Sequence, residues 1–189
     1  MCITDKLKEE GFVSTKYLSD WQEQQLQDAV RKGEAVRLKN GIYADIDALA
    51  NTMVDIRMIV PGGILCLWSA WSVYNLTTQI PNAYYIAIER TRKIVLPDYP
   101  EFQLVYQSDN LLSIGATRKN VQGYDIPIFD MERSVCDAIK YRNKVGIDVM
   151  AEILQTYLRR PDKNISRLMD YASKLRIRKT LNQYLEVWQ

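Results

Sequence analysis

The apolar positions of residues 20–32 recur at helical spacing. One face collects the apolar side chains, which are Leu26, Ala29 and Val30, and this predicts an amphipathic helix. Asp20, followed three residues later by Glu23, has the outline of a capping box, so we expect Asp20 to cap the helix. Gly33 stands where a C-terminal glycine belongs, and the helix should therefore end there.

The pattern changes to a strand period immediately afterwards. Apolar Val36 and Leu38 alternate with cationic side chains, as in a strand with one buried face. Asn40-Gly41 follows, which is the dipeptide that a two-residue hairpin turn requires, because both central residues adopt positive φ. These residues predict a β-hairpin with a basic tip.

Two shorter helices are expected upstream of this hairpin. Residues 3–10 would form the first helix. Ser14 can cap the second, which would hold Tyr17 and Leu18, with Ser19-Asp20 as the turn after it. Helices followed by a hairpin are typical of a winged helix-turn-helix, so we predict a DNA-binding domain over residues 1–46 with the hairpin as its wing.

Polar side chains on this predicted domain are the candidates for contact with double-stranded DNA, because glutamine can pair with adenine and arginine with guanine. The candidate DNA-binding residues are Lys16, Tyr17, Gln24, Gln27, Arg31, Lys32, Arg37, Lys39 and Asn40. Residues 1–45 hold seven bases and eight acids, so the positive charge is concentrated at the helix end and the hairpin. A solvated helix face beside an ordinary hairpin is the alternative interpretation.

Residues 47–189 read as an α+β domain that ends in a helical segment. A helix is expected from about Asp47 to Val60, and Ser69 is expected to cap a short helix through Tyr74. The expected strands are Ile64–Trp68, Tyr84–Glu89, Gln103–Tyr106, Leu112–Ala116 and Tyr124–Phe129. From Met131 onward the apolar residues recur at helical spacing.

The helical C-terminal segment carries the excess of positive charge. Residues 131–189 contain twelve bases and seven acids. The cations gather around two predicted helix junctions and form what we call the C-terminal basic cluster: Arg159, Arg160, Lys163, Arg167, Lys174, Arg176, Arg178 and Lys179. They are interpreted either as ordinary helix-end residues or as a second contact surface for DNA, RNA or an acidic partner.

Composition narrows the functional classes. The 189 residues carry a net charge of +2, and three widely separated cysteines indicate reduced thiols in a cytoplasmic protein. Residues 58–88 lack charge, but polar residues and prolines interrupt them, so no membrane span is expected. The absence of histidine and of phosphate-loop or nucleophile motifs argues against an enzyme, a metal site or a cofactor. A metal-dependent nuclease stays as a minor hypothesis, because Asp98, Glu101 and Gln103 faintly resemble the carboxylate pair of a nuclease.

The order of several short motifs resembles the AbiEi family, antitoxins of type IV toxin–antitoxin systems that also repress transcription. Gly41-Ile42-Tyr43-Ala44 is similar to the end of the family's wing. Ser69-Ala70 followed by Asn75-Leu76 resembles its Ser-Ala…Gly-Leu element, and residues 128–137 (IFDMERSVCD) resemble its Glu-Arg-Thr-x-x-Asp signature. A C-terminal helical tail with Tyr171-Ala172 and basic residues completes the resemblance.

The resemblance implies an autorepressor that binds inverted repeats in its own promoter. It also implies that the C-terminal domain counteracts a nucleotidyltransferase-like toxin encoded alongside, without a stable complex between the two proteins. A winged-helix regulator with a ligand-sensing or dimerising C-terminal domain, and no toxin, is the alternative.

Three charged residues of the signature could suggest catalysis. Arg133 and Asp137 are four residues apart, which predicts a surface ion pair worth about 0.3–0.5 kcal/mol. Glu132 lies in the first helical turn, where a carboxylate suits the helix dipole. We therefore expect these residues to serve helix architecture.

Overall fold

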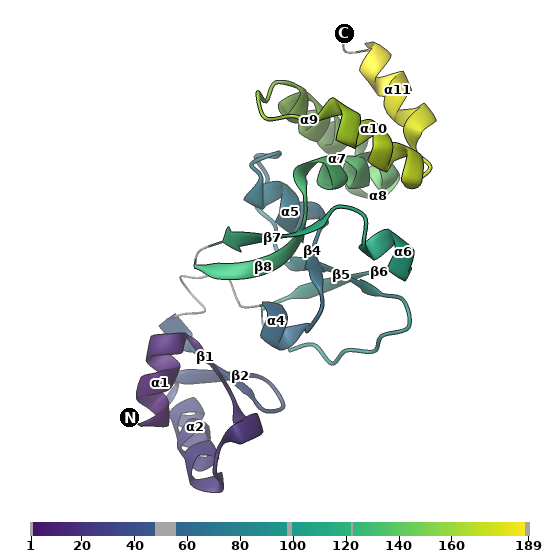
Figure 1. Ribbon diagram of the computed structural model, residues 1–189. Helices are drawn as coiled ribbons and strands as arrows, with labels where there is room; N and C mark the ends of the chain where they lie inside the picture. The colour runs from purple at the N-terminus through teal and green to yellow at the C-terminus, as the bar shows by residue number, and fades with distance from the viewer. Residues whose placement is uncertain (1, 48–55, 98–99, 122, 188–189) are drawn as a thin grey trace. The chain divides into compact units, whose positions relative to one another are not determined.

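The computed structural model describes residues 2–47, 56–97, 100–121 and 123–187, which form a mixed α+β structure (Figure 1). The chain divides into two compact units. One comprises Met1–Gly63, Lys93–Phe102 and Asn120–Ile126, and the other comprises Ile64–Arg92, Gln103–Lys119 and Pro127–Gln189. The predicted domain boundary between residues 46 and 47 stays a prediction.

The first unit begins with helices packed on a small sheet. Its elements are α1 (Ile3–Glu10), β1 (Phe12–Ser14), η1 (Thr15–Tyr17), α2 (Asp20–Lys32), β2 (Ala35–Lys39) and β3 (Ile42–Asp45). The three strands are antiparallel in the order β1-β3-β2. Leu7, Val13, Leu26 and Tyr43 are buried between the helices and the sheet. The expected first helix and the hairpin that turns at Asn40-Gly41 are confirmed.

The N-terminus of α2 differs from the prediction, because Ser19 rather than Asp20 caps it. The Gln22 backbone N–H donates to Ser19 Oγ at 3.4 Å, and Gln22 Oε1 accepts from the Ser19 backbone N–H at 3.0 Å. This reciprocal pair is a capping box one residue earlier than expected. Gly33 ends α2 in the left-handed conformation with φ 74°, as predicted.

The second expected helix is only a 3-10 turn. Ser14 caps η1 by accepting from the Lys16 backbone N–H at 3.4 Å, but Leu18 lies beyond the turn. Strand β1 and the cap of α2 leave too few residues between them for an α-helix. The helix expected over residues 47–60 falls mostly on residues 48–55, outside the described part of the chain, and α4 (Ile56–Ile59) is helical.

A five-stranded sheet and a helical layer make up the rest of the fold. The order of strands is β6-β5-β4-β8-β7. The elements are β4 (Ile64–Leu65), α5 (Leu67–Val73), β5 (Tyr84–Glu89), β6 (Phe102–Gln107), α6 (Asp109–Leu112), β7 (Ala116–Val121), β8 (Tyr124–Phe129), α7 (Met131–Lys140), α8 (Arg142–Val145), α9 (Ile147–Leu158), α10 (Ile165–Lys174) and α11 (Arg178–Val187). Strand β4 runs antiparallel to β5 and parallel to β8.

Helix α7 lies at the centre of the helical layer. Figure 1 shows α7, α9 and α10 side by side, and Val135, Ile139, Met150, Ile153 and Leu168 belong to their common core. Every residue of α7 from Met131 to Ile139 is buried. The expected switch to helices at Met131 is confirmed.

Three details of this region correct the sequence predictions. The strand expected over Ile64–Trp68 ends at Leu65, because α5 begins at Leu67. Ser69 lies inside α5 and caps nothing. Its Oγ accepts from the Tyr85 backbone N–H at 2.9 Å and donates to the Ala83 carbonyl at 3.4 Å, which joins α5 to β5.

The expected strand Leu112–Ala116 is also wrong, because α6 and a turn occupy that stretch and the strand begins at Ala116. Strand β7 is polar and exposed along almost its whole length, so it has no alternating apolar pattern to reveal it. The other expected strands correspond to β5, β6 and β8.

Within the described ranges, each helix is too short or too polar to cross a membrane.

Candidate nucleic-acid interface

The outward face of α2 presents the polar residues that the sequence indicated. Gln24, Gln27 and Arg31 are exposed, whereas Leu26 and Ala29 are buried against the sheet. Spacings of three and four residues place the polar group on one side of the helix. This face is therefore open to a partner along the length of α2.

The hairpin beside α2 presents a second polar group. Helix α2 packs against β2, and Arg37 on this strand is exposed. Arg37 Nη2 donates to Asn40 Oδ1 at 2.5 Å, and the guanidinium carbon lies 6.0 Å from the centroid of the Tyr43 ring. Both contacts lie within the hairpin, and none of the described carboxylates forms an ion pair with Arg37. The side chain of Lys39 lies outside the described part of the structure.

The C-terminal end of α2 carries two exposed cations. Arg31 Nη2 lies 2.6 Å from Asp28 Oδ1, and the two side chains are 66% and 51% exposed. An exposed pair of this kind contributes about 0–1 kcal/mol, so a phosphate or a base edge can compete for the guanidinium. Lys32 is exposed as well. The predicted cations of α2 and the tip are therefore accessible where the structure describes them.

Aromatic side chains are exposed at the other end of α2. Tyr17 is 85% exposed, and Lys16 Nζ lies 5.3 Å from its ring centroid. Trp21, in the first turn of α2, is 67% exposed. Our sequence reasoning missed Trp21. The available signal was a tryptophan outside the apolar stripe of an amphipathic helix, since large aromatic residues are usually buried.

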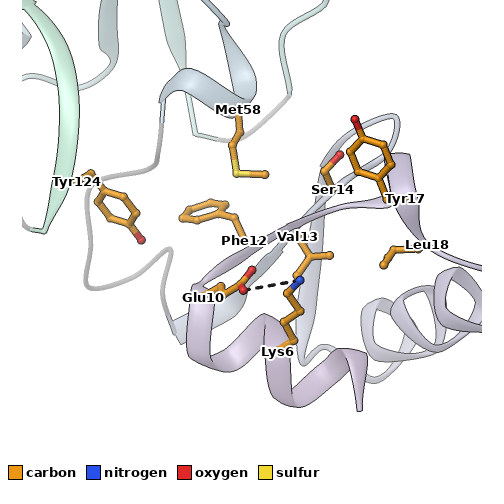
Figure 2. A pocket seen from close by; sticks show the side chains of 9 residues that line it. All are labelled: Lys6, Glu10, Phe12, Val13, Ser14, Tyr17, Leu18, Met58 and Tyr124. Atoms are coloured by element: carbon orange, nitrogen blue, oxygen red, sulfur yellow. Dashed lines mark ion pairs between the residues drawn. The ribbon is translucent and has the colours of Figure 1, made fainter. Parts of the chain in front are cut away.

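The first unit also contains a pocket of about 450 Å³ (Figure 2). Its charged lining residues are Lys6 and Glu10, whose Nζ and Oε1 lie 3.7 Å apart as an ion pair. Phe12 and Tyr17 contribute aromatic side chains to the lining. The lining combines one cation, one anion and aromatic and aliphatic side chains, so it indicates no one class of ligand.

Several residues of the C-terminal basic cluster contact other groups of the protein. Arg160 donates from Nε and Nη2 to the two carboxylate oxygens of Asp162, both at 2.8 Å, and from Nη1 to the Tyr74 carbonyl at 3.2 Å. Hydrogen bonds from Arg160 lower the pKa of the Asp162 carboxyl. Lys174 Nζ lies 2.7 Å from Asp170 Oδ2. Each of these two cations is therefore paired with an acid.

Other members of the cluster join neighbouring elements. Lys163 Nζ donates to the Leu158 carbonyl at 2.8 Å, and Arg178 Nη1 donates to Ser173 Oγ at 3.3 Å. Arg159, Arg176 and Lys179 are exposed without a polar side-chain contact to the described residues. These three cations lie at helix ends, as the helix-junction interpretation expects, and the choice between that interpretation and a second contact surface stays a prediction.

Arg133 occupies a fully buried polar site. Its Nε donates to Asp137 Oδ1 at 3.0 Å, and its Nη2 donates to Gln107 Oε1 at 2.7 Å. Nη1 donates to the carbonyls of Leu111 and Ile114 at 2.6 and 2.7 Å. The predicted ion pair between Arg133 and Asp137 is therefore confirmed, but its predicted place at the surface is wrong, because neighbouring elements cover α7. Burial raises the pKa of the Asp137 carboxyl, and the positive charge of Arg133 opposes this shift.

Glu132 joins α7 to the segment before α10. Its Oε1 accepts from the Tyr157 hydroxyl and from the Asn164 backbone N–H, both at 3.1 Å. The same N–H lies 2.9 Å from the Tyr157 hydroxyl oxygen, and Arg167 Nη1 lies 3.6 Å from Glu132 Oε2. The carboxylate is thus engaged by contacts within the protein.

Asp130, Glu132, Arg133 and Asp137 together form what we call the polar centre of α7, and Asp130 is the last of them to be described. Its Oδ1 accepts from the Arg133 backbone N–H at 2.8 Å and so caps α7, while Oδ2 accepts from the Tyr171 hydroxyl at 2.9 Å. Burial raises the pKa of Asp130 and that of Tyr171, the latter to about 12. The Asp130 carboxylate thus caps α7 and joins it to α10.

Asp98 of the nuclease hypothesis lies outside the described residues, and Glu101 and Gln103 are exposed. In the described ranges, no three His, Cys, Asp or Glu residues are grouped closely enough to hold a metal ion.

Comparison with known proteins gives no family for this chain, since no protein-family model and no curated protein matches it.

Proposed function

We propose that the chain is a DNA-binding autorepressor and antitoxin similar to the AbiEi family, with residues 1–46 acting as a winged helix-turn-helix on promoter inverted repeats. The observation that carries the proposal is the exposed Gln24, Gln27 and Arg31 face of α2 packed beside a hairpin that exposes Arg37. A helix that offers glutamine and arginine suits a major groove, and a basic hairpin suits the adjoining phosphates.

Two features of the second unit support the resemblance. Asn75 has φ 53°, and it stands where the family commonly has glycine, so the backbone there has the conformation that favours glycine and tolerates asparagine. The signature residues Asp130, Glu132, Arg133 and Asp137 form the polar centre of the helical layer. A position fixed by such contacts accounts for a signature without invoking catalysis.

The DNA-binding part is tested with the full-length protein and a labelled duplex from upstream of its own gene. Binding is measured by fluorescence anisotropy at several salt concentrations. We expect the logarithm of the affinity to fall linearly with the logarithm of salt concentration, because phosphate contacts release counterions. A duplex of scrambled sequence is the control, and equal affinity for the two duplexes would contradict a promoter-specific repressor.

The antitoxin part is tested in cells. We expect the adjacent reading frame to encode a nucleotidyltransferase-like toxin in the same cytoplasmic compartment, and its expression to stop growth unless this chain is also expressed. Variants of the second unit then locate the antitoxic residues. If DNA binding holds but the neighbour encodes no such protein, the function is that of a winged-helix regulator with a sensing or dimerising second domain.

A further inference from the structure

We propose that Trp21 and Tyr17 contact the C5-methyl groups of thymine in the major groove, so that the first unit recognises operators rich in A·T pairs. This inference rests on the proposed DNA-binding function and adds the base composition of its target. It starts from the exposure of the two rings, 67% for Trp21 and 85% for Tyr17.

Exposed aromatic side chains of this size need an explanation, because burying either ring would remove a large apolar area from water. The core of the first unit is already filled by other side chains, including Leu7, Leu26 and Tyr43. Tyr17 ends η1 and Trp21 lies in the first turn of α2, so the two residues stand on either side of Ser19, the cap of α2. A partner that approaches the N-terminus of α2 therefore meets two exposed aromatic rings.

The local charge at the hairpin end of α2 favours a nucleic acid over an apolar protein surface as the partner. Residues 31–40 contain four bases and one acid, so the far end of α2 and the hairpin are cationic. Lys16 Nζ lies 5.3 Å from the Tyr17 ring centroid, which adds a cation beside the aromatic group. A polyanion that spans α2 would meet cations at both ends, with the neutral Gln24 and Gln27 and the Arg31-paired Asp28 between them.

The neutral side chains specify A·T pairs. Gln24 and Gln27 are exposed between the aromatic end of α2 and its cationic end, and glutamine forms a bidentate pair with adenine. The opposite base of each such pair is thymine, whose methyl group is the apolar feature of the major groove. Trp21 lies three residues before Gln24, about one helical turn away. It can therefore contact the base pair next to the one that Gln24 contacts.

The test removes the methyl groups. The probe is the duplex from upstream of the gene, compared with the same duplex in which deoxyuridine replaces thymidine. We expect the unmodified protein to lose roughly fourfold in affinity for each contacted methyl, the equivalent of one buried methylene. Trp21→Ala should bind the two duplexes more nearly equally, while Trp21→Phe should retain the difference. Tyr106→Ala, which removes an exposed aromatic ring of the second unit, is the matched control and should behave as the unmodified protein.

The outcomes separate this inference from the proposed function. If the protein binds the natural duplex with a salt dependence but does not distinguish uracil from thymine, DNA binding stands and the methyl contact is wrong. An equal uracil effect in Trp21→Ala and the unmodified protein would also overturn it. Tighter binding to the separated strands would indicate stacking on unpaired bases instead. Absence of binding to every DNA removes both proposals.

Discussion

Arg133 Nε and Asp137 Oδ1 lie 3.0 Å apart on α7, and neither side chain is exposed to solvent. The pair has the same four-residue spacing as Lys174 and Asp170 on α10, whose side chains are 54% and 53% exposed. Two pairs with one sequence spacing thus lie in opposite environments. Their energetic roles should differ accordingly, since a buried charge that loses its partner cannot recover its hydration.

Asp137→Ala should reduce the free energy of unfolding by about 3–5 kcal/mol, because it leaves the Arg133 guanidinium buried without its counter-charge. Asp170→Ala is the matched control and should change the same quantity by about 0.5 kcal/mol or less. Urea denaturation of the full-length protein measures both. Similar losses in the two variants would contradict the difference in burial.

Tyr157→Phe should destabilise the protein by about 1–3 kcal/mol, because the lost hydroxyl leaves Glu132 short of a donor in a buried site. Tyr171→Phe removes a hydroxyl from the half-buried contact to Asp130, where water can substitute, and we expect about 1 kcal/mol or less. Thermal unfolding of the two variants measures which one loses more stability. The reverse order would show that the Glu132 contact is dispensable.

Gly115→Ala should be strongly destabilising. Gly115 has φ 70°, and a Cβ there would lie 2.5 Å from the Cβ of Arg133, which backbone contacts hold in place. Gly123→Ala is the control, since φ is 89° but no described atom lies within 4 Å of the added carbon. We expect about 1 kcal/mol for the control and at least about twice that loss for Gly115→Ala. Equal losses of unfolding free energy in the two variants would mean that α7 shifts away from the added Cβ at little energetic cost.

Glu152→Gln should make the free energy of unfolding less dependent on pH under acidic conditions. Burial alone would raise the pKa of Glu152, but hydrogen bonds from Thr78 and Thr77 outweigh it and lower the pKa below its ordinary value of 4.5. A lowered carboxyl pKa contributes stability above that value, and the contribution is lost as pH falls through the folded-state pKa. The free energy of unfolding should therefore decline less steeply below about pH 4.5 in the variant than in the unmodified protein. Parallel curves would contradict the assignment.

Arg37→Ala combined with Lys39→Ala should reduce the salt dependence of DNA binding. If each side chain contacts one phosphate, the slope of log affinity against log salt becomes smaller by about 1.8. Lys8→Ala combined with Lys93→Ala removes two exposed lysines elsewhere and should leave the slope unchanged. Anisotropy titrations of the upstream duplex provide the slopes. An unchanged slope in the first variant would exclude the hairpin from the interface.

Helix α2 and the hairpin of the first unit could be predicted from the sequence, because residues close together in the chain determine both. The apolar stripe of residues 26–30, the glycine at position 33 and the Asn40-Gly41 turn each have a local physical cause, and α2 and the hairpin follow from them. The cap was placed one residue late because Asp20 and Ser19 are both good capping residues. The exposed face of α2 could likewise be predicted, since it is the complement of the apolar stripe.

Strand β7 and the polar centre of α7 could not be predicted in this way. The sequence shows that Arg133 and Asp137 share a helix face, but Gln107, Leu111 and Ile114 reach Arg133 from segments about twenty residues away. Burial of α7 depends on α5, α9 and α10 packing around it. The sequence by itself therefore determined where α2 and the hairpin form, because residues close together in the chain determine helices and turns. Which charges are buried, and at what energetic cost, was decided only by tertiary packing, because distant segments exclude the water.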